Sequence, residues 1–250
     1  MRYINCAHKM VVEYVFKVRQ FRLLGSDSFM KITDGVFQVE GVNCNVYLVE
    51  DEDKLILIDT GLPRSAKKIK KCIEDLGRKP TDVSTIVITH FHIDHVGSLK
   101  KMKDATAAKV AVHEADADYV AGKKAPPKPK NLMFKALSSI VKAEPVEPDI
   151  VLKEGSKVGR LTVIHTPGHS EGSISLFDID RKVMFSGDAI RFKDGKLEGP
   201  PSQFTLDPDK ARESIEKIST FDFDIMLGGH GQPLKENASQ KIREFNSTLK

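Results

Sequence analysis

The chain has 250 residues, of which 40% are hydrophobic and 30% are charged, and its formal charge is +4. This length is enough for one domain with a buried core that needs no disulfide bonds, so we expect a single domain over 1–250. The 39 basic and 35 acidic residues are mixed along the chain, which argues against a nucleic-acid groove. No stretch approaches the roughly 18 apolar residues needed to cross a bilayer, so no membrane partner is expected.

The cysteines and the first residues indicate a soluble, cytoplasmic protein. Cys6, Cys44 and Cys72 are odd in number and lack Cys-x-x-Cys spacing, which argues against a secreted disulfide framework and against a thiolate metal site. The first ten residues contain no apolar run typical of a signal peptide. An assembly of identical copies is also compatible with the sequence.

Short runs rich in Val, Ile and Leu predict the strands of the first half, at 35–39, 45–49, 55–58, 85–89 and 109–112. The spacing of apolar residues over 65–76 predicts a helix, with Cys72 on its buried face and Gly77 as its C-terminal cap. A polar helical segment is expected over 114–120. Strands and helices therefore alternate, which indicates an α/β fold.

The region 114–148 is interpreted as an insertion that covers the active site. Three prolines and four lysines predict a solvated loop over 121–130. The following segment, 131–142, has one apolar helical face. It is either a helix packed on the body of the protein or a lid.

The second half continues with predicted strands at 161–164, 173–177, 182–185 and 224–227. Asp207 followed by Pro208 is a typical helix start, because Asp caps the N-terminus and Pro fits the first helical position. Ala211, Ile215 and Ile218 then form the buried face of that helix.

Three imidazoles and one carboxylate follow the strand at 85–89 within six positions: His90, His92, Asp94 and His95. The carboxyl end of a strand is where α/β proteins place their chemistry, so we expect these residues in a loop beyond it. Imidazole nitrogen and carboxylate oxygen are the ligands that zinc uses in hydrolytic sites. The cluster therefore predicts a metal site.

Two further histidines, His169 and His230, lie in glycine-flanked turns, where small neighbours allow the backbone to approach a compact site. His8, His113 and His165 lie outside these motifs, and core or hydrogen-bonding roles are expected for them. No Gly-x-Ser-x-Gly motif is present, and no cysteine adjoins the cluster, so a Ser or Cys nucleophile is not expected.

In chain order, the motifs are Thr-His-x-His-x-Asp-His, Thr-Pro-Gly-His, Ser-Gly-Asp and Gly-His-Gly. Together they resemble those of the metallo-β-lactamase superfamily over about 33–235. The resemblance implies a four-layer αβ/βα sandwich, in which two β-sheets lie face to face with helices outside and a metal site at one edge.

The resemblance also implies a role for each matching residue. The first metal would be held by His90, His92 and His169, the second by Asp94, His95 and His230, with Asp188 as the bridge. Asp59 would support the ligands from behind, although a turn-initiating role before Gly61 is an equal alternative. Two divalent ions are implied, with zinc expected and iron or manganese as alternatives. Their bridging hydroxide would be the nucleophile, and Asp94 would orient the water and accept its proton.

These features favour a hydrolase whose substrate is a small ester, lactone, thioester or phosphoester. True metallo-β-lactamases lack the Asp188 bridge, and flavodiiron proteins have Glu at the position of His92. The 20 residues after His230 are too few for the glutathione-binding region of glyoxalase II. An RNA-processing nuclease, for which 121–130 would be a short basic arm, remains an alternative. A persulfide dioxygenase-like enzyme with one Fe(II) on His90, His169 and Asp188, or a non-catalytic relic, also remains.

Overall fold

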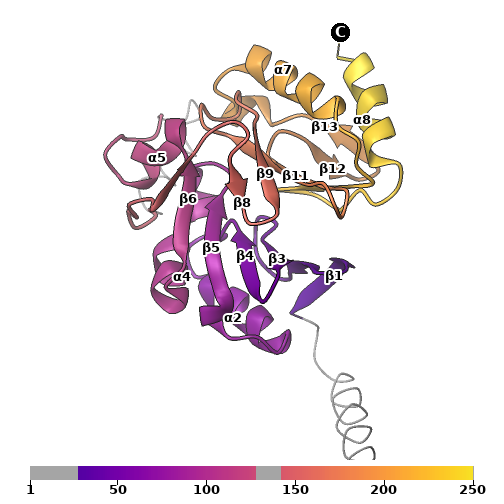
Figure 1. The fold of residues 1–250 in the computed structure, drawn as a ribbon. Coiled ribbons are helices and arrows are strands. Elements are labelled where there is room, and N and C mark those ends of the chain that lie inside the picture. The colour runs from indigo at the N-terminus through magenta and orange to yellow at the C-terminus, as the bar shows by residue number, and fades with distance from the viewer. Residues whose placement is uncertain (1–27, 128–141, 250) are drawn as a thin grey trace, which may run out of the picture.

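The computed structural model describes residues 28–127 and 142–249. Within these ranges two β-sheets lie face to face, with helices on both outer surfaces (Figure 1). This arrangement confirms the expected αβ/βα sandwich. None of the helices in these two ranges is long and apolar enough to cross a membrane.

The first sheet contains seven strands that lie side by side in chain order. They are β1 (Phe29–Thr33), β2 (Val36–Val39), β3 (Tyr47–Asp51), β4 (Lys54–Ile58), β5 (Val83–Ile88), β6 (Lys109–His113) and β7 (Ile150–Leu152). The pairs from β1 to β4 are antiparallel and those from β4 to β7 are parallel. Parallel neighbours need crossover connections, and these contain α2 (Ala66–Asp75), the short helix η2 (Pro80–Asp82), α3 (Ile93–Val96), α4 (Leu99–Thr106) and α5 (Glu114–Val120).

The second sheet has five strands in the order β14-β11-β10-β9-β8. They are β8 (Lys157–Val158), β9 (Leu161–His165), β10 (Ile174–Asp178), β11 (Val183–Gly187) and β14 (Ile225–Gly228). Between β11 and β14 the chain forms the hairpin β12 (Arg191–Lys193) and β13 (Lys196–Glu198), then η3 (Ser202–Phe204) and α7 (Pro208–Ser219). The helix α8 (Ala238–Ser247) follows β14 and contacts α7.

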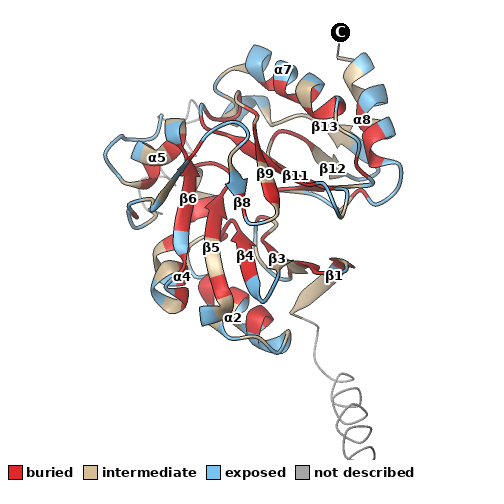
Figure 2. Cartoon of the chain, viewed as in Figure 1, coloured by how far each residue is buried: buried red, intermediate tan, exposed pale blue. Residues whose placement is uncertain are grey.

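Three apolar clusters hold the layers together. In β4, Leu57 points to the cluster beneath α2 and α4, whereas Ile58 points to the cluster between the sheets. The third cluster joins the second sheet to α7 and α8. Figure 2 shows the central strands buried along most of their length. Each fully buried Leu or Ile contributes roughly 1.5–3 kcal/mol, so the clusters are the main source of stability.

Every strand predicted from the sequence is confirmed, with bounds that differ by one or two residues. The helix predicted at 65–76 is α2, with Cys72 fully buried and Gly77 at φ 75°. Asp207 caps α7 as expected, because its side chain accepts hydrogen bonds from Asp209 N and Lys210 N. The strands β1, β7, β8, β12 and β13 and the helices α4 and α8 were not predicted.

The described part of the insertion 114–148 contains α5 and, as expected, irregular chain from Ala121 to residue 127. The helix or lid predicted at 131–142 lies, except for Lys142, outside the described residues. Cys6 and His8 also lie outside them.

Candidate metal centre

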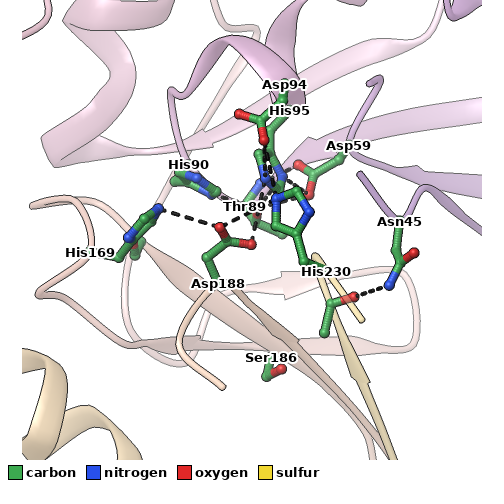
Figure 3. Close-up of polar contacts among 12 residues, drawn as sticks. Asn45, Asp59, Thr89, His90, Asp94, His95, His169, Ser186, Asp188 and His230 are labelled. Atoms are coloured by element: carbon green, nitrogen blue, oxygen red, sulfur yellow. Dashed lines mark hydrogen bonds and ion pairs between the residues drawn. The ribbon is translucent and has the colours of Figure 1, made fainter. Parts of the chain in front are cut away.

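The carboxyl ends of several strands from both sheets meet at one edge of the sandwich, and all seven predicted ligands lie there. Figure 3 labels each of them except His92. The chain after β5 carries His90 and His92, and the loop between β9 and β10 carries His169. Asp188 directly follows β11, and His230 lies two residues beyond β14. The motifs are far apart in the sequence but converge because their strands share one edge.

The structure corrects one detail of the first motif. Asp94 and His95 lie on the helical turn α3 and not in a simple loop, with His92 in extended conformation as its N-terminal cap. The turn directs the two side chains differently from His90 and His92. One short motif can therefore supply His90 and His92 to one cluster of ligand atoms and Asp94 and His95 to another.

Three groups of side chains have ligand atoms that all lie within 4.8 Å of one another. They are His90, His92 and His169; Asp94, His95 and His230; and His90, His95 and Asp188. We call the first the first ligand set and the second the second ligand set. They coincide with the two sets implied by the family resemblance, and the third group links them through Asp188. None of the three groups found in the described ranges includes a cysteine.

Asp188 lies between the two sets. Its Oδ1 is 3.5 Å from His95 Nε2, and its Oδ2 is 3.4 Å from His169 Nε2 and 3.6 Å from His230 Nε2. These separations exceed the usual 2.7–3.2 Å of a hydrogen bond, so the carboxylate is near both sets without bonding directly to either. The preceding Ser186 anchors this turn, because its Oγ donates to the carbonyl of Ile190 at 2.8 Å.

Several buried polar atoms at this edge have no hydrogen-bond partner: His90 Nε2, His95 Nε2, both ring nitrogens of His169, and Asp188 Oδ1. Buried polar atoms are nearly always hydrogen-bonded, so a cluster of orphaned ligand atoms needs a missing partner. A divalent metal ion satisfies imidazole nitrogen and carboxylate oxygen together. The residues present therefore fit metal ions.

Burial favours the neutral form of the first ligand set. It lowers the pKa of His169 to about 2 and that of His92 to about 4, and it holds the pKa of His90 well below its usual value; neighbouring histidines lower all three further. Neutral imidazole is the form that binds metals. These side chains therefore do not have to lose protons before a metal binds at neutral pH.

His95 differs because it faces three carboxylates. Burial alone would lower its pKa, but Asp59, Asp188 and Asp94 outweigh burial and raise the pKa to about 10. In the same way, burial would raise the pKa of Asp94, but the facing His95 and His230 hold it well below its usual range. The metal-free site therefore keeps a proton on His95 at neutral pH, which a metal ion must displace.

Asp59 lies directly behind His95. Its Oδ2 is 2.8 Å from His95 Nδ1, and its two oxygens accept hydrogen bonds from Thr89 N and Thr89 Oγ1, each at 2.8 Å. Asp59 is 1% exposed and has a left-handed backbone, φ 61°. Such backbone strain is common at functional sites. The structure thus brings Asp59 against a candidate ligand, and Thr89, which the sequence reasoning did not single out, is part of the same contact.

The loop that carries His230 is held by the first sheet. Asn45 Nδ2 donates to the carbonyls of Gly228 and Gly231, each at 2.9 Å, and Tyr47 Oη donates to Gly228 at 2.7 Å. A Cβ on Gly229 would collide with Asp188 Oδ1 and lie 2.8 Å from His95 Cε1. The expected need for small residues here is confirmed. Asn45 and Tyr47 were missed, because the sequence places them only in a strand.

His113 and His165 lie outside all three groups of ligand atoms. Their rings stack at 4.0 Å with 15° between planes, and His113 Nδ1 accepts a hydrogen bond from Ala115 N. Burial, and then the charge of His165, lower the pKa of His113 to about 4. The expected core and hydrogen-bonding roles agree with these contacts.

The stability of the metal-free protein should fall as the pH decreases from about 6.5 to about 4. Unfolded histidines titrate near 6.5, and four histidines have lowered pKa values in the folded state: His90, His92, His113 and His169. In this window the unfolded chain binds protons that the folded chain does not. Each such group removes about 1.4 kcal/mol per pH unit.

Two carboxylates oppose this trend. Burial raises the pKa of Asp116 to about 6 and also raises that of Asp188, so the folded protein gains protons there. The expected net slope is about 3 kcal/mol per pH unit. Urea unfolding with a chelator at several pH values measures it. A profile that is flat from pH 6.5 to 4 would contradict these shifts.

A family model described as the metallo-beta-lactamase superfamily matches residues 39–230. The chain is 30% identical over 260 residues to the "Probable metallo-hydrolase YflN" of Bacillus subtilis (strain 168), covering 90% of this chain and 98% of that protein. It is 32% identical over 197 residues to the "Acyl-coenzyme A thioesterase MBLAC2" of Homo sapiens, covering 66% of each.

Solved structures agree with these relatives. BJP-1, a subclass B3 metallo-beta-lactamase of Bradyrhizobium japonicum, superposes with a TM-score of 0.65 at 25% identity, covering 89% of this chain and 90% of that one. The protein TTHA1623, solved in a di-iron-bound form, superposes with a TM-score of 0.64 at 25% identity, covering 79% of this chain and 92% of that one.

Proposed function

Because the chain belongs to the metallo-β-lactamase superfamily and is a metal-dependent hydrolase, we propose that it is a dinuclear enzyme that cleaves small thioesters. The first ligand set would hold one metal ion, the second would hold the other, and Asp188 would contact both. The observation that carries the proposal is the convergence of seven candidate ligand residues, four of which have a buried polar atom without a hydrogen-bond partner: His90, His95, His169 and Asp188. Zinc suits this histidine-rich set, and iron is the alternative, as in the di-iron form of TTHA1623.

Two metal ions, when bound, lower the pKa of water and stabilise the negative charge that develops on the carbonyl oxygen. The chain would hold and orient the ligands around them. Asp59 fixes the ring of His95 through Nδ1, which leaves Nε2 directed at the site. Asn45 and Tyr47 fix the loop of His230.

The exposure of the ligands indicates where substrate approaches. The side chains of Asp94 and His230 are 31% and 33% exposed, whereas Asp188 is 9% exposed and His95 is fully buried. Substrate would therefore reach the site over Asp94 and His230. Asp94 Oδ2 is 3.1 Å from His230 Nε2, so this carboxylate is held at the open side, where we assign it to accept a proton from the attacking water.

The thioester class rests on the relatives. MBLAC2 is named an acyl-coenzyme A thioesterase, and the alignment covers 66% of this chain. Esters, lactones and phosphoesters are hydrolysed by the same kind of attack, in which a metal-activated water adds to a polarised carbonyl or phosphoryl group. They therefore serve as the comparison substrates.

Elemental analysis of the purified protein, followed by a hydrolysis panel, tests the proposal. We expect about two metal ions per chain and chelator-sensitive hydrolysis of acyl-coenzyme A above that of matched esters, lactones and phosphodiesters. Asp94→Asn should lower kcat by about 10²–10⁴-fold. Asp104→Asn, an exposed aspartate on α4 paired with Lys100, is the control and should change nothing.

Other outcomes are equally informative. A single iron per chain with dioxygenase activity on a persulfide would replace the dinuclear hydrolase by the one-iron alternative. Faster cleavage of an RNA substrate than of any thioester would favour the nuclease. No metal after reconstitution would refute the proposal.

A further inference from the structure

A buried carboxylate that belongs to neither ligand set lies beside the first one. Asp116, in the first turn of α5, is fully buried. Its Oδ2 accepts hydrogen bonds from Phe91 N at 3.0 Å and from Ser170 Oγ at 2.8 Å, and its Oδ1 accepts one from Gly172 N at 2.8 Å. All of these partners lie in chain segments that carry metal-type histidines.

The partners come from different sheets. Phe91 stands between His90 and His92 in the chain after β5, and Ser170 directly follows His169 in the loop between β9 and β10. One carboxylate therefore connects the two segments that must come together to complete the first ligand set. A change of about 1 Å in such spacing is enough to impair a site of this kind.

The contact is tight and energetically demanding. A Cβ on Gly172 would lie 2.6 Å from Asp116 Cγ, so the loop approaches the carboxylate as closely as glycine allows. A buried carboxylate is unfavourable unless hydrogen bonds compensate for lost solvation. Burial raises the pKa of Asp116 to about 6, while the bonds from Ser170, Gly172 and Phe91 lower it. An apolar side chain would avoid burying a carboxylate, but it would leave Phe91 N, Gly172 N and Ser170 Oγ without this acceptor.

We propose that Asp116 is a positioning residue that sets the spacing between the His90–His92 segment and His169, and thereby the affinity of the first ligand set for its metal ion. The inference rests on the proposed function, because it requires that this set holds a metal. It is selective: among the contacts of the described residues, those of Asp116 reach the neighbours of the first ligand set and not Asp94, His95 or His230.

The test compares Asp116→Asn with Asp178→Asn. Asp178 is also a fully buried carboxylate that accepts several hydrogen bonds, from Arg160 and Arg181, but it ends β10 at the far side of the sheet. In Asp116→Asn one acceptor oxygen becomes an NH₂ group facing an N–H or O–H donor. The readout is stepwise zinc affinity, measured by competition with a chromophoric chelator.

We expect Asp116→Asn to weaken one of the two zinc sites by about 10–100-fold, the usual effect of losing a residue that orients metal ligands. The other site should stay within about threefold of wild type. Asp178→Asn should lower the Tm and leave both affinities unchanged. Equal weakening in both variants would show a general loss of stability and overturn the proposal, as would unchanged affinity in Asp116→Asn.

If Asp116→Asn does not fold, Ser170→Ala removes one of the three bonds with little change in volume. It should weaken the same site by about fivefold. Ser239→Ala changes another buried serine, whose Oγ lies 3.5 Å from Oδ1 of Asp222, and should have no effect. Unchanged affinity in Ser170→Ala would then overturn the proposal. Absence of zinc binding in the wild type would instead refute the proposed function and, with it, this inference.

Discussion

Replacing Asp188 by alanine is expected to lower kcat/KM by about 10³-fold or more, which corresponds to about 4 kcal/mol of lost transition-state stabilisation. The same change should reduce the bound metal from about two ions per chain to about one. Asp188 is the carboxylate whose oxygens lie within 3.6 Å of histidines from both ligand sets, so in the proposed dinuclear site its removal would take one ligand from each metal ion. Elemental analysis and steady-state kinetics on the same preparation measure both effects.

The fold should survive this substitution, because Asp188 occupies a turn after β11 and not a core strand. Circular dichroism and the Tm in the presence of chelator check this. Asp180→Ala, an aspartate at the opposite end of the β10–β11 hairpin with a 75% exposed side chain, is the control. If Asp188→Ala retains both ions and wild-type activity, the bridging assignment is wrong.

Replacing Asp59 by alanine should lower the free energy of unfolding of the metal-free protein by about 3–5 kcal/mol. The substitution removes one partner of the buried Asp59–His95 pair and leaves Thr89 N without its acceptor. It also removes one of the partners of Thr89 Oγ1, which lies 3.1 Å from His90 Nδ1 as well. The change further replaces Asp, whose short polar side chain tolerates the left-handed backbone at φ 61°, by alanine, which lacks that local hydrogen bonding. Urea unfolding with a chelator measures the loss.

Asp59→Asn separates these causes. Asparagine tolerates the left-handed backbone and keeps one acceptor oxygen for Thr89, so we expect a smaller loss of about 1–2 kcal/mol. If the alanine and asparagine variants lose the same free energy of unfolding, the hydrogen bonds that Asp59 accepts do not contribute to stability. A loss below about 1 kcal/mol for alanine would show that the His95 contact is not important for stability.

The strands could be predicted from local patterns of the sequence, and the convergence of the candidate ligands from the resemblance to a known family. The buried runs of β4, β5, β10 and β11 are continuous stretches of apolar residues. His169, Asp188 and His230 come just after strands, and the resemblance to a known family then fixed which edge they share. Cys72 and Asp207 were predictable for the same reason, since helical spacing and capping act within a few residues.

Other features depend on contacts that no local pattern reports. Asn237 and Ser98, which cap α8 and α4, are residue types that often begin helices, but neither makes a side-chain capping bond. The strand β1 is only partly buried and lacks a clear alternation. Asp116 lies in a short polar helix, and its three partners are 25 to 56 positions away along the chain. Its burial became evident only in three dimensions.

The candidate ligands are divided between the two sheets, and this division determines when the site forms during folding. His90, His92, Asp94 and His95 are synthesised with the first sheet, whereas His230 follows His90 by more than half the length of the chain. During synthesis the N-terminal half emerges first and begins to fold. Neither ligand set is complete until the second sheet has docked, so the nascent chain exposes histidines before it can hold a metal firmly. If the two sets bind metal ions as proposed, metal acquisition would be coupled to the last stage of folding, and the bound metal would stabilise the docked sheets.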